Sequence, residues 1–200
     1  MAKIEIIQGD CLEIMKTFSD NQFDLVLTDP PYPDYHEELY EYPHAISGIK
    51  YLHQFRCKQV VFWSAKAPPV VDEDLTAIHI WDKKTGCGSM YERIFEYYGQ
   101  SAYKVYRHYL INSTMAASFT RDVWTKHPSQ KPIKLICELV EEHTHPNDTV
   151  LDPFLGSGTT AVACERMGRN CVGIEISPEY CEIARKRVQE EKDKMGLFPE

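Results

Sequence analysis

The chain has 200 residues, of which 43% are hydrophobic, and a formal net charge of −8 at pH 7. This length suits one domain with a sizeable core, and the composition is ordinary for a globular protein. No apolar run approaches the roughly 20 residues of a membrane span, and the N-terminus lacks a signal-peptide pattern. We therefore expect a cytoplasmic protein with no membrane partner.

The cysteines and the net charge limit the class of protein further. The seven cysteines are odd in number, scattered and without a Cys-x-x-Cys pair, which indicates reduced thiols. The negative net charge counts against a nucleic-acid partner unless positive charge is concentrated in one segment.

The chain opens with an alternating pattern over residues 3–7, which predicts a short strand. Asp10 follows it, and either caps a helix over 12–18 or lies with Cys11 beside a bound ligand. A second apolar run, residues 23–27, is rich in branched aliphatic side chains and predicts a buried strand.

Asp29, Pro30, Pro31 and Tyr32 come directly after this second strand. Asp29 therefore lies where the strand leaves the sheet, the edge at which open α/β sheets bind ligands. Both prolines have a fixed φ and no N–H, so the turn is stiff. A carboxylate, the Pro30 carbonyl and an aromatic ring suit the exocyclic amino group of a flat, stackable base. A simple Pro-Pro turn capped by Asp29 is the alternative.

The next segments are a loop, a helix and three strands. Residues 33–43 hold four carboxylates, three tyrosines and no lysine or arginine, which predicts a solvated loop or a lid over a flipped base. A helix is expected over 46–56, and strands over 59–63, 77–81 and 93–98. Residues 83–88 predict a basic turn, with a phosphate contact as the alternative.

Residues 99–131 concentrate positive charge. They contain five basic residues and a single acid, a balance of +4 in a chain of −8, and tyrosine, phenylalanine and tryptophan are interleaved with the bases: Lys104, Arg107, Arg121, Lys126, Lys131 and Asp122, with Tyr103, Tyr106, Tyr109, Phe119 and Trp124. Basic side chains alternating with aromatic ones suit phosphates and unstacked bases. An aromatic β-segment that completes the sheet is the alternative.

The C-terminal part alternates helices and strands. Helices are expected from Pro132 to about 144, over 159–167 and over 178–192, with strands over 148–152 and 171–174. His143 and His145 at a helix end are expected to be capping residues rather than metal ligands.

A glycine-rich turn connects the strand that ends at Asp152 to the helix that begins at Thr159. Its glycines allow close approach of the backbone to a ligand, and Glu175 ends the next strand about 20 residues later, where a carboxylate can take both hydroxyls of a ribose. No lysine follows the glycines, so a phosphate-binding P-loop is not expected.

Five short motifs together resemble the amino-methylating DNA methyltransferases that use S-adenosylmethionine. They are Gly9-Asp10-Cys11, Asp29-Pro30-Pro31-Tyr32, His127-Pro128-Ser129-Gln130-Lys131-Pro132, Asp152-Pro153-Phe154 with Gly156-Ser157-Gly158-Thr159-Thr160, and Gly173-Ile174-Glu175-Ile176-Ser177. The resemblance extends from about residue 4 to residue 187. The catalytic motif precedes the cofactor loop, as in the circularly permuted β group of this family, whose members are encoded by bacteria and phages.

The resemblance implies an α/β fold in a single domain over 1–200: a doubly wound, mostly parallel, seven-stranded Rossmann-like sheet, circularly permuted, with the strand near 93–98 antiparallel. Residues 3–98 would form the catalytic half, 99–131 a short DNA-recognition segment and 132–190 the cofactor-binding half. It implies catalysis by Asp29, Pro30, Pro31 and Tyr32, no metal, and S-adenosylmethionine bound by Asp10, Cys11, Lys131, Asp152, Phe154, Gly156, Ser157, Gly158, Thr159, Thr160 and Glu175.

The expected reaction is methylation of adenine N6 in DNA, because in the family Asp at the position of Asp29 is more typical of adenine enzymes and Ser of cytosine enzymes. Methylation of cytosine N4 and an inactive binding subunit are the alternatives. Larger members carry a substantial target-recognition region, for which only residues 99–131 are available here. A homodimer would double this small basic surface, and a role in restriction-modification is expected from the resemblance.

Overall fold

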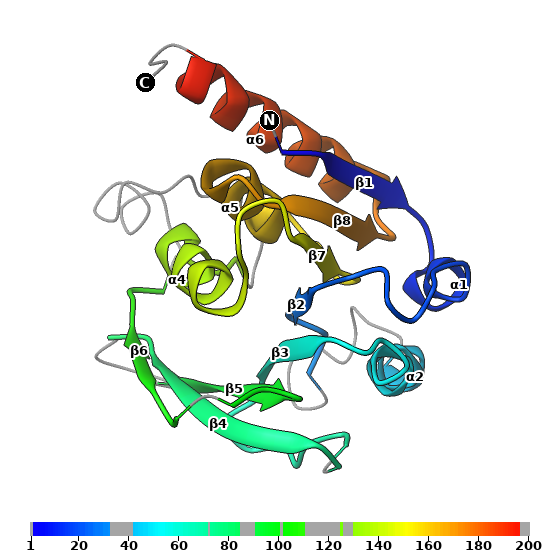
Figure 1. The fold of residues 1–200 in the computed structure, drawn as a ribbon, viewed down its shortest axis with the longest axis vertical. Coiled ribbons are helices and arrows are strands. Elements are labelled where there is room, and N and C mark those ends of the chain that lie inside the picture. The colour runs from blue at the N-terminus through cyan, green and yellow to red at the C-terminus, as the bar shows by residue number, and fades with distance from the viewer. Residues whose placement is uncertain are drawn as a thin grey trace.

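The structure is a computed structural model that describes residues 2–32, 42–71, 73–84, 91–100, 102–110, 125 and 130–196. Within them, the strands form one eight-stranded sheet in the order β1-β8-β7-β2-β3-β5-β4-β6 (Figure 1). The strands are β1 (Ile4–Gln8), β2 (Leu25–Thr28), β3 (Lys58–Trp63), β4 (Leu75–Asp82), β5 (Tyr91–Tyr97), β6 (Val105–Arg107), β7 (Thr149–Asp152) and β8 (Asn170–Glu175).

The sheet is mostly parallel, as expected. The β1–β8, β8–β7, β7–β2 and β2–β3 pairs are all parallel, whereas β5 is antiparallel to both β3 and β4. The predicted antiparallel strand near 93–98 is therefore confirmed as β5. The chain reaches β7 and β8 last, yet these strands lie between β1 and β2, and this order makes the fold doubly wound.

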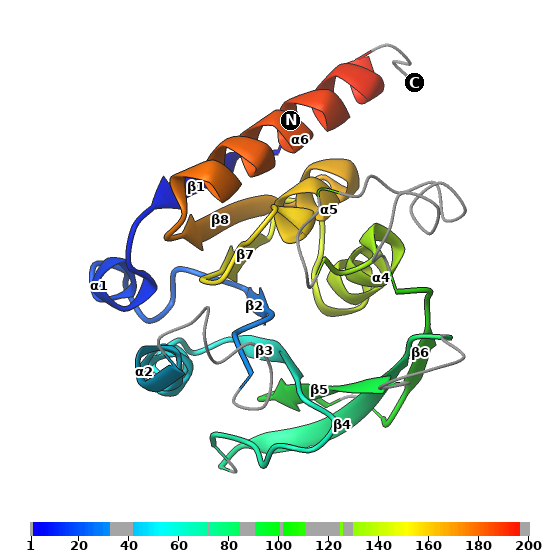
Figure 2. The same ribbon diagram turned by 180° about the vertical axis from the view of Figure 1, so that it is seen from behind.

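Helices cover both faces of the sheet (Figures 1 and 2). One face carries α1 and α2, and the other carries α4, α5 and α6. The helices are α1 (Cys11–Met15), α2 (Tyr42–Leu52), α4 (Ile133–His143), α5 (Thr159–Met167) and α6 (Pro178–Gly196). Helix α1 ends three residues earlier than expected, and α2 lies four residues nearer the N-terminus than the predicted 46–56.

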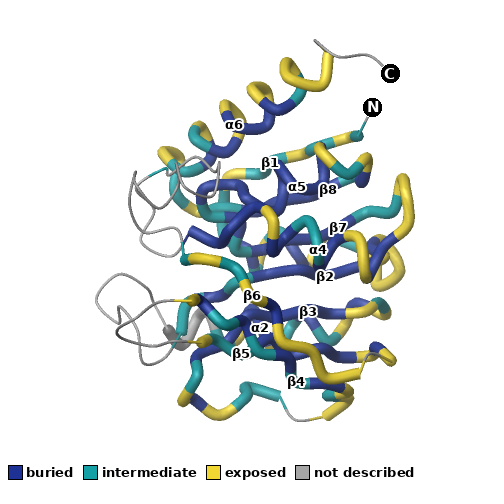
Figure 3. Tube along the Cα trace, turned by 90° about the vertical axis from the view of Figure 1, so that its left-hand side faces the viewer, coloured by how far each residue is buried: buried dark blue, intermediate teal, exposed yellow. Residues whose placement is uncertain are grey.

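Apolar clusters occupy both sides of the central strands, whose traces are buried along most of their length (Figure 3). Leu25 and Leu27 of β2 face the cluster under α4 and α5, while Val26 between them faces the cluster under α1 and α2. This alternation explains why β2 reads as a continuous apolar run rather than as an amphipathic strand. Among the described cysteines, Cys164 and Cys171 lie in the first cluster, as core residues.

The sheet has one strand more than the seven expected, and the additional strand is β6. Its three residues pair in parallel with the end of β4, and Tyr106 is buried between exposed Val105 and Arg107. The Tyr106 hydroxyl donates a hydrogen bond of 2.7 Å to Glu142 of α4, and the Trp81 indole donates one of 2.9 Å to the His108 carbonyl. A three-residue strand is too short for periodicity to reveal, and these side-chain bonds stabilise it instead.

Loss of a core side chain should be costly on either side of the sheet. Leu27→Ala leaves a cavity in the cluster under α4 and α5, and Leu151→Ala leaves one in the cluster under α1 and α2. Both side chains are fully buried. Each is expected to lower the free energy of unfolding by about 2–5 kcal/mol, measured by chemical denaturation. Val105→Ala on the exposed face of β6 is the control, with an expected change within about 0.5 kcal/mol. A small cost for only one of the two leucine variants would contradict a sheet covered on both faces.

Candidate active site

The two predicted motifs meet because β2 and β7 are neighbours. Their parallel pairing aligns Leu25 with Val150 and Val26 with Leu151, so both strands end at the same edge of the sheet. There the Thr28 hydroxyl donates a hydrogen bond of 2.7 Å to Asp152, across 124 residues of sequence. Asp29 follows Thr28 directly, so the predicted catalytic turn begins beside the predicted cofactor loop.

Asp29 lies in a network of charged and polar side chains. Its Oδ1 accepts a hydrogen bond of 2.6 Å from the Tyr32 hydroxyl, and its Oδ2 is paired with the Lys131 ammonium. The Lys131 Nζ also lies 3.3 Å from Glu92, whose other carboxylate oxygen is 2.6 Å from the Lys83 Nζ. Pro30 is buried, and the Tyr32 ring packs at 5.7 Å from the ring of Trp63. Two acids and two bases thus converge from four different segments.

Burial and neighbouring charges act in opposite directions on these groups. Burial raises the pKa of Asp29 above its usual value, against the opposing effect of Lys131. Burial also disfavours charge on Glu92, but its pKa is lowered because Lys131 and Lys83 together outweigh that effect. The pKa of Lys131 is raised, since its two carboxylate partners overcome the cost of its burial. Lys131 therefore remains an ammonium group at neutral pH.

The glycine turn after β7 is shaped by close packing. Gly156 has a φ of 54° and Gly158 a φ of 86°, and a Cβ on Gly158 would lie 2.6 Å from the Cβ of Ala184 in α6. From the same helix, the Arg187 guanidinium donates hydrogen bonds of 2.6 Å to the Ser157 carbonyl and 3.3 Å to the Thr159 hydroxyl. Helix α6 therefore fixes the turn from behind. The sequence predicted only a helix over 178–192 here, and the buried Arg187 was missed.

Glu175 ends β8 next to this turn. Its two carboxylate oxygens accept hydrogen bonds of 2.8 Å, one from the Gly156 backbone N–H and one from that of Ser177. Burial raises its pKa. An oriented carboxylate beside a glycine turn at the carboxyl edge of the sheet is a donor and acceptor set that fits a nucleoside. The residues present are therefore compatible with the predicted cofactor.

Asp10 and Cys11 lie at the end of β1, which neighbours β8. Asp10 is the N-cap of α1: its side chain accepts hydrogen bonds of 2.8 Å from the Leu12 N–H and 3.1 Å from the Glu13 N–H. The capping alternative for Asp10 is therefore confirmed, while its role towards a cofactor stays a prediction. Burial raises the pKa of Cys11 to about 11, so it remains a thiol, and its Sγ lies close to Gly48, as does Phe154.

A family model described as DNA methylase matches residues 80–186. The chain belongs to this family. The methylase is 31% identical over 207 residues to the YubD protein of Escherichia coli (strain K12). The alignment covers 91% of this chain and 88% of YubD. It is 25% identical to the type II methyltransferase M2.MboI of Moraxella bovis, over 92% of this chain and 87% of that protein.

Solved structures agree with the family at the level of the fold. The complex of M1.HpyAVI with SAM matches with a TM-score of 0.70 and 25% identity, and the match covers 92% of the methylase and 98% of that chain. The cytosine-N4-specific PvuII DNA methyltransferase also matches with a TM-score of 0.70, over 96% of this chain and 91% of that one. Because its identity is only 18%, it shows a shared fold and nothing more.

The structure brings together most of the predicted site residues that it describes. Asp29, Pro30, Pro31, Tyr32 and Lys131 form one group, and the second group contains Asp152, Phe154, Gly156, Ser157, Gly158, Thr159, Thr160 and Glu175. Lys131 was expected to bind the cofactor, and the structure pairs it with the predicted catalytic carboxylate. Glu92 was missed, and Lys83, expected in a basic turn with a phosphate contact as the alternative, is buried and pairs with Glu92 instead. Glu92 lies in a strand that also carries Arg93 and Glu96, so nothing in the sequence pattern distinguished it.

Several expectations lie outside the described residues. These are residues 33–41 of the acidic loop, residues 85–88 of the basic turn, and His127, Pro128 and Ser129. The loop was expected over 33–43, but its last two residues begin α2. Among the described residues, no cluster of His, Cys, Asp or Glu is arranged to hold a metal ion, and no helix is long and apolar enough to cross a membrane.

Asp152 should make stability depend on pH. Burial raises its pKa from 3.8 to about 6, so between these values the folded chain holds a proton that the unfolded chain releases. The stabilisation is complete below about pH 4 and is lost as the pH rises through 6, a change of up to about 3 kcal/mol. Unfolding free energies of the parent and of Asp152→Asn, measured from pH 4 to 7.5, should diverge in this way. Parallel curves would show that Asp152 ionises normally.

Proposed function

We propose that this methylase transfers a methyl group from S-adenosylmethionine to the exocyclic N6 amino group of adenine in DNA. The observation that carries the proposal is the position of the Asp29 carboxylate at the end of β2, one residue beyond the Thr28–Asp152 hydrogen bond to the glycine turn. An acceptor for an amino group and a site suited to a nucleoside cofactor thus lie at one edge of the sheet.

The chemistry follows from the weakness of an aromatic amine as a nucleophile. Its lone pair is delocalised into the ring, and two acceptors for its N–H groups favour a tetrahedral nitrogen with a localised lone pair. We assign these roles to the Asp29 carboxylate and the Pro30 carbonyl, and assign stacking on the base to Tyr32. The cofactor, when bound, supplies an already activated methyl group, so the protein mainly contributes positioning and charge complementarity.

The reaction also releases one proton from the amine nitrogen. Asp29 is suited to accept it, since burial raises the pKa of this carboxyl above that of an ordinary aspartate. A water molecule is the alternative acceptor. The target base must first leave the duplex at a cost of a few kcal/mol, which stacking on Tyr32 partly offsets.

Adenine is favoured over cytosine by the residue type at position 29. In the family that the chain resembles, Asp there is more typical of adenine enzymes and Ser of cytosine enzymes. Methylation of cytosine N4 is the second candidate, because the family model that matches the chain covers both N6 and N4 methylation. Relatives named as type II methyltransferases support a role in restriction-modification.

Catalysis should depend on Asp29 and on the ring of Tyr32. Asp29→Ala is expected to abolish methyl transfer and to leave the affinity for S-adenosylmethionine within a few fold, because the carboxylate addresses the base. Tyr32→Ala should impair turnover more than Tyr32→Phe, which keeps the stacking face. Modified DNA digested to nucleosides and analysed by mass spectrometry should contain 6-methyladenine. Near-parental turnover by Asp29→Ala would refute the mechanism, and 4-methylcytosine would reverse the choice of base.

We also propose that DNA contacts the outer edge of the sheet. Lys84, Tyr103, Val105, Arg107 and Tyr109 form what we call the β6 surface, and Tyr103 is 77% exposed. The Lys84 Nζ lies 5.2 Å from the centroid of the Tyr109 ring, and the Arg107 side chain extends into solvent with Asp82 at 3.6 Å. Exposed cations beside exposed rings suit phosphates and unstacked bases.

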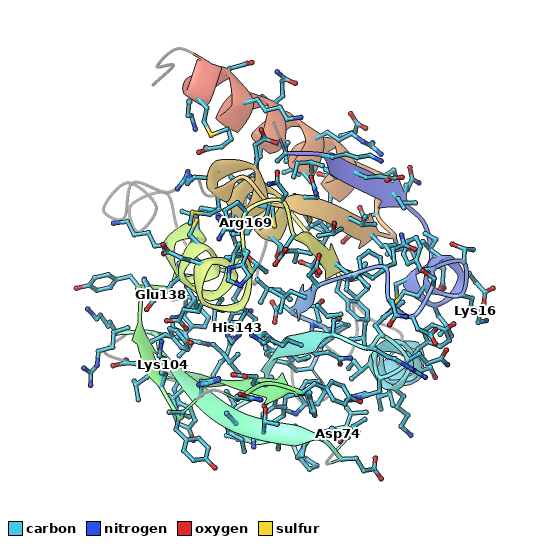
Figure 4. All side chains as sticks on the ribbon, viewed as in Figure 1. Lys16, Asp74, Lys104, Glu138, His143 and Arg169 are labelled. Carbon is cyan, nitrogen blue, oxygen red and sulfur yellow. The ribbon has the colours of Figure 1, made fainter. Side chains whose placement is uncertain are left out.

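The rest of this edge is anchored to α4. Lys104 is paired with Glu142, and the His108 Nε2 lies 2.7 Å from Glu138. Figure 4 shows Lys104 and Glu138 on the side of the molecule where β6 meets α4. The alternatives for this segment are therefore compatible: β6 completes the sheet through buried Tyr106 while its other side remains available to DNA. Arg121, Lys126, Phe119 and Trp124 lie outside the described residues. The homodimer expected from the sequence stays a prediction.

The β6 surface should determine the salt dependence of DNA binding. Each lost phosphate contact makes the negative slope of log K, the DNA association constant, against log salt shallower by about 0.9. Lys84→Ala combined with Arg107→Ala should therefore make it shallower by up to about 1.8. Lys186→Ala with Lys192→Ala on α6 removes the same charge elsewhere and serves as the control. Binding is measured by fluorescence anisotropy at several salt concentrations. Equal slopes for the two double variants would show that DNA binds at another surface.

A further inference from the structure

Lys131 is shared between two carboxylates of the active site. Its ammonium group is paired with Asp29 and lies 3.3 Å from Glu92 Oε2. Only 6% of the Lys131 side chain is exposed, and its Nζ lies 5.1 Å from the centroid of the Phe62 ring and 5.7 Å from that of Trp81. Aromatic rings replace water around the ammonium, so it depends on carboxylates for charge compensation.

Glu92 reaches this ammonium from the antiparallel strand β5. Besides Lys131, it contacts the Lys83 Nζ at 2.6 Å and accepts from the Tyr32 hydroxyl at 3.1 Å. The hydroxyl of Tyr32 has one proton and two acceptors within reach, Glu92 and Asp29. The Lys131 ammonium and the Tyr32 hydroxyl, which both bind Asp29, are therefore also in contact with Glu92.

This arrangement competes with the role proposed for Asp29. Each oxygen of Asp29 already accepts from one partner, Tyr32 or Lys131, so an incoming amino group must share that oxygen with the partner or replace it. A buried ammonium that loses its carboxylate without replacement costs several kcal/mol. A second carboxylate, already close to the same ammonium, removes most of this cost.

We propose that Glu92 is a positioning residue, which holds Lys131 and the Tyr32 hydroxyl while Asp29 accepts the target amino group. The proposal rests on the function assigned to Asp29 above. Lys83 keeps Glu92 in place from the side away from Lys131. Glu92 itself does not touch the base, and acts through the two groups that it shares with Asp29.

Charge balance at the site supports this role. Asp29 and Glu92 balance Lys131 and Lys83, so the four side chains sum to zero. The attacking amine acquires positive charge as its nitrogen gains the methyl group and before it releases its proton. Without Glu92 the cluster would carry a net +1, and Lys131 would remain on Asp29. Both effects oppose the reaction.

The test compares Glu92→Gln with Glu96→Gln in steady-state methylation of DNA at saturating S-adenosylmethionine. Glu96 lies four residues along the same strand, is fully buried and pairs with His79 at 2.9 Å, so the control removes a buried carboxylate from β5 away from Asp29. We expect kcat to fall on the order of 10- to 100-fold in Glu92→Gln, with KM for S-adenosylmethionine within a few fold. Glu96→Gln should lower thermal stability while retaining kcat per folded molecule.

Two further measurements separate positioning from a general structural effect. Removal of the Glu92 charge lowers the pKa of Asp29, so the acidic limb of the kcat profile should move to lower pH in Glu92→Gln and stay in place in Glu96→Gln. Lys131→Gln should also partly restore the activity lost in Glu92→Gln, because it removes the ammonium that Glu92 no longer holds and returns the cluster to zero net charge.

If Glu92→Gln does not fold, Glu92→Asp replaces it, since this variant keeps the charge and withdraws it by one carbon. Its kcat should lie between those of the parent and of Asp29→Ala. A parental kcat and pH profile in the folded Glu92 variant, or additive losses with Lys131→Gln, would overturn the proposal. Failure of the proposed function is distinguishable, since the parent would then form no 6-methyladenine, and failure of the role of Asp29 would leave Asp29→Ala as active as the parent.

Discussion

The pairing of β2 with β7 is the constraint on which the site depends. The two strands are separated by more than a hundred residues, and their parallel register ends both at one edge of the sheet. The Thr28–Asp152 hydrogen bond joins these ends directly. Because side chains of β2 are buried on both sides, a slip by one residue would turn every one of them to the wrong cluster. The same packing that stabilises the core thus sets the distance between the two motifs.

The proposed active site concentrates charge in a part of the molecule that excludes much of the solvent. Such a cluster is tolerated because acids and bases balance and because each buried group has several partners. Asp29 is the most exposed of the paired side chains in this cluster, at 21%, whereas Glu92 and Lys131 lie behind it. This difference in exposure fits the proposal that Asp29 exchanges hydrogen-bond partners, while Glu92 and Lys131 stay paired with each other.

Because the chain has a net charge of −8, the proposed binding of DNA requires a surface where basic side chains are segregated. The described part of the segment between β5 and α4 both completes the sheet and presents side chains to solvent. Tyr106 and Trp81 fix β6 to the sheet and to α4, while Val105 and Arg107 alternate with Tyr106 and face outward. The two-residue period of a strand makes this division possible.

The sequence by itself determined the fold class, the order of the main elements and the residues of both motifs. Strong apolar runs such as residues 23–27 and 171–174, and glycines at positions of positive φ, act locally and can be recognised without tertiary context. Only the tertiary structure decided which charges meet. Glu92, Lys83 and Lys131 come from separate segments, and Arg187 reaches Ser157 from a helix whose sequence mixes acidic and basic residues. Contacts of this kind depend on the register of distant strands and on the packing of α6 over the glycine turn, neither of which leaves a periodic trace in the sequence.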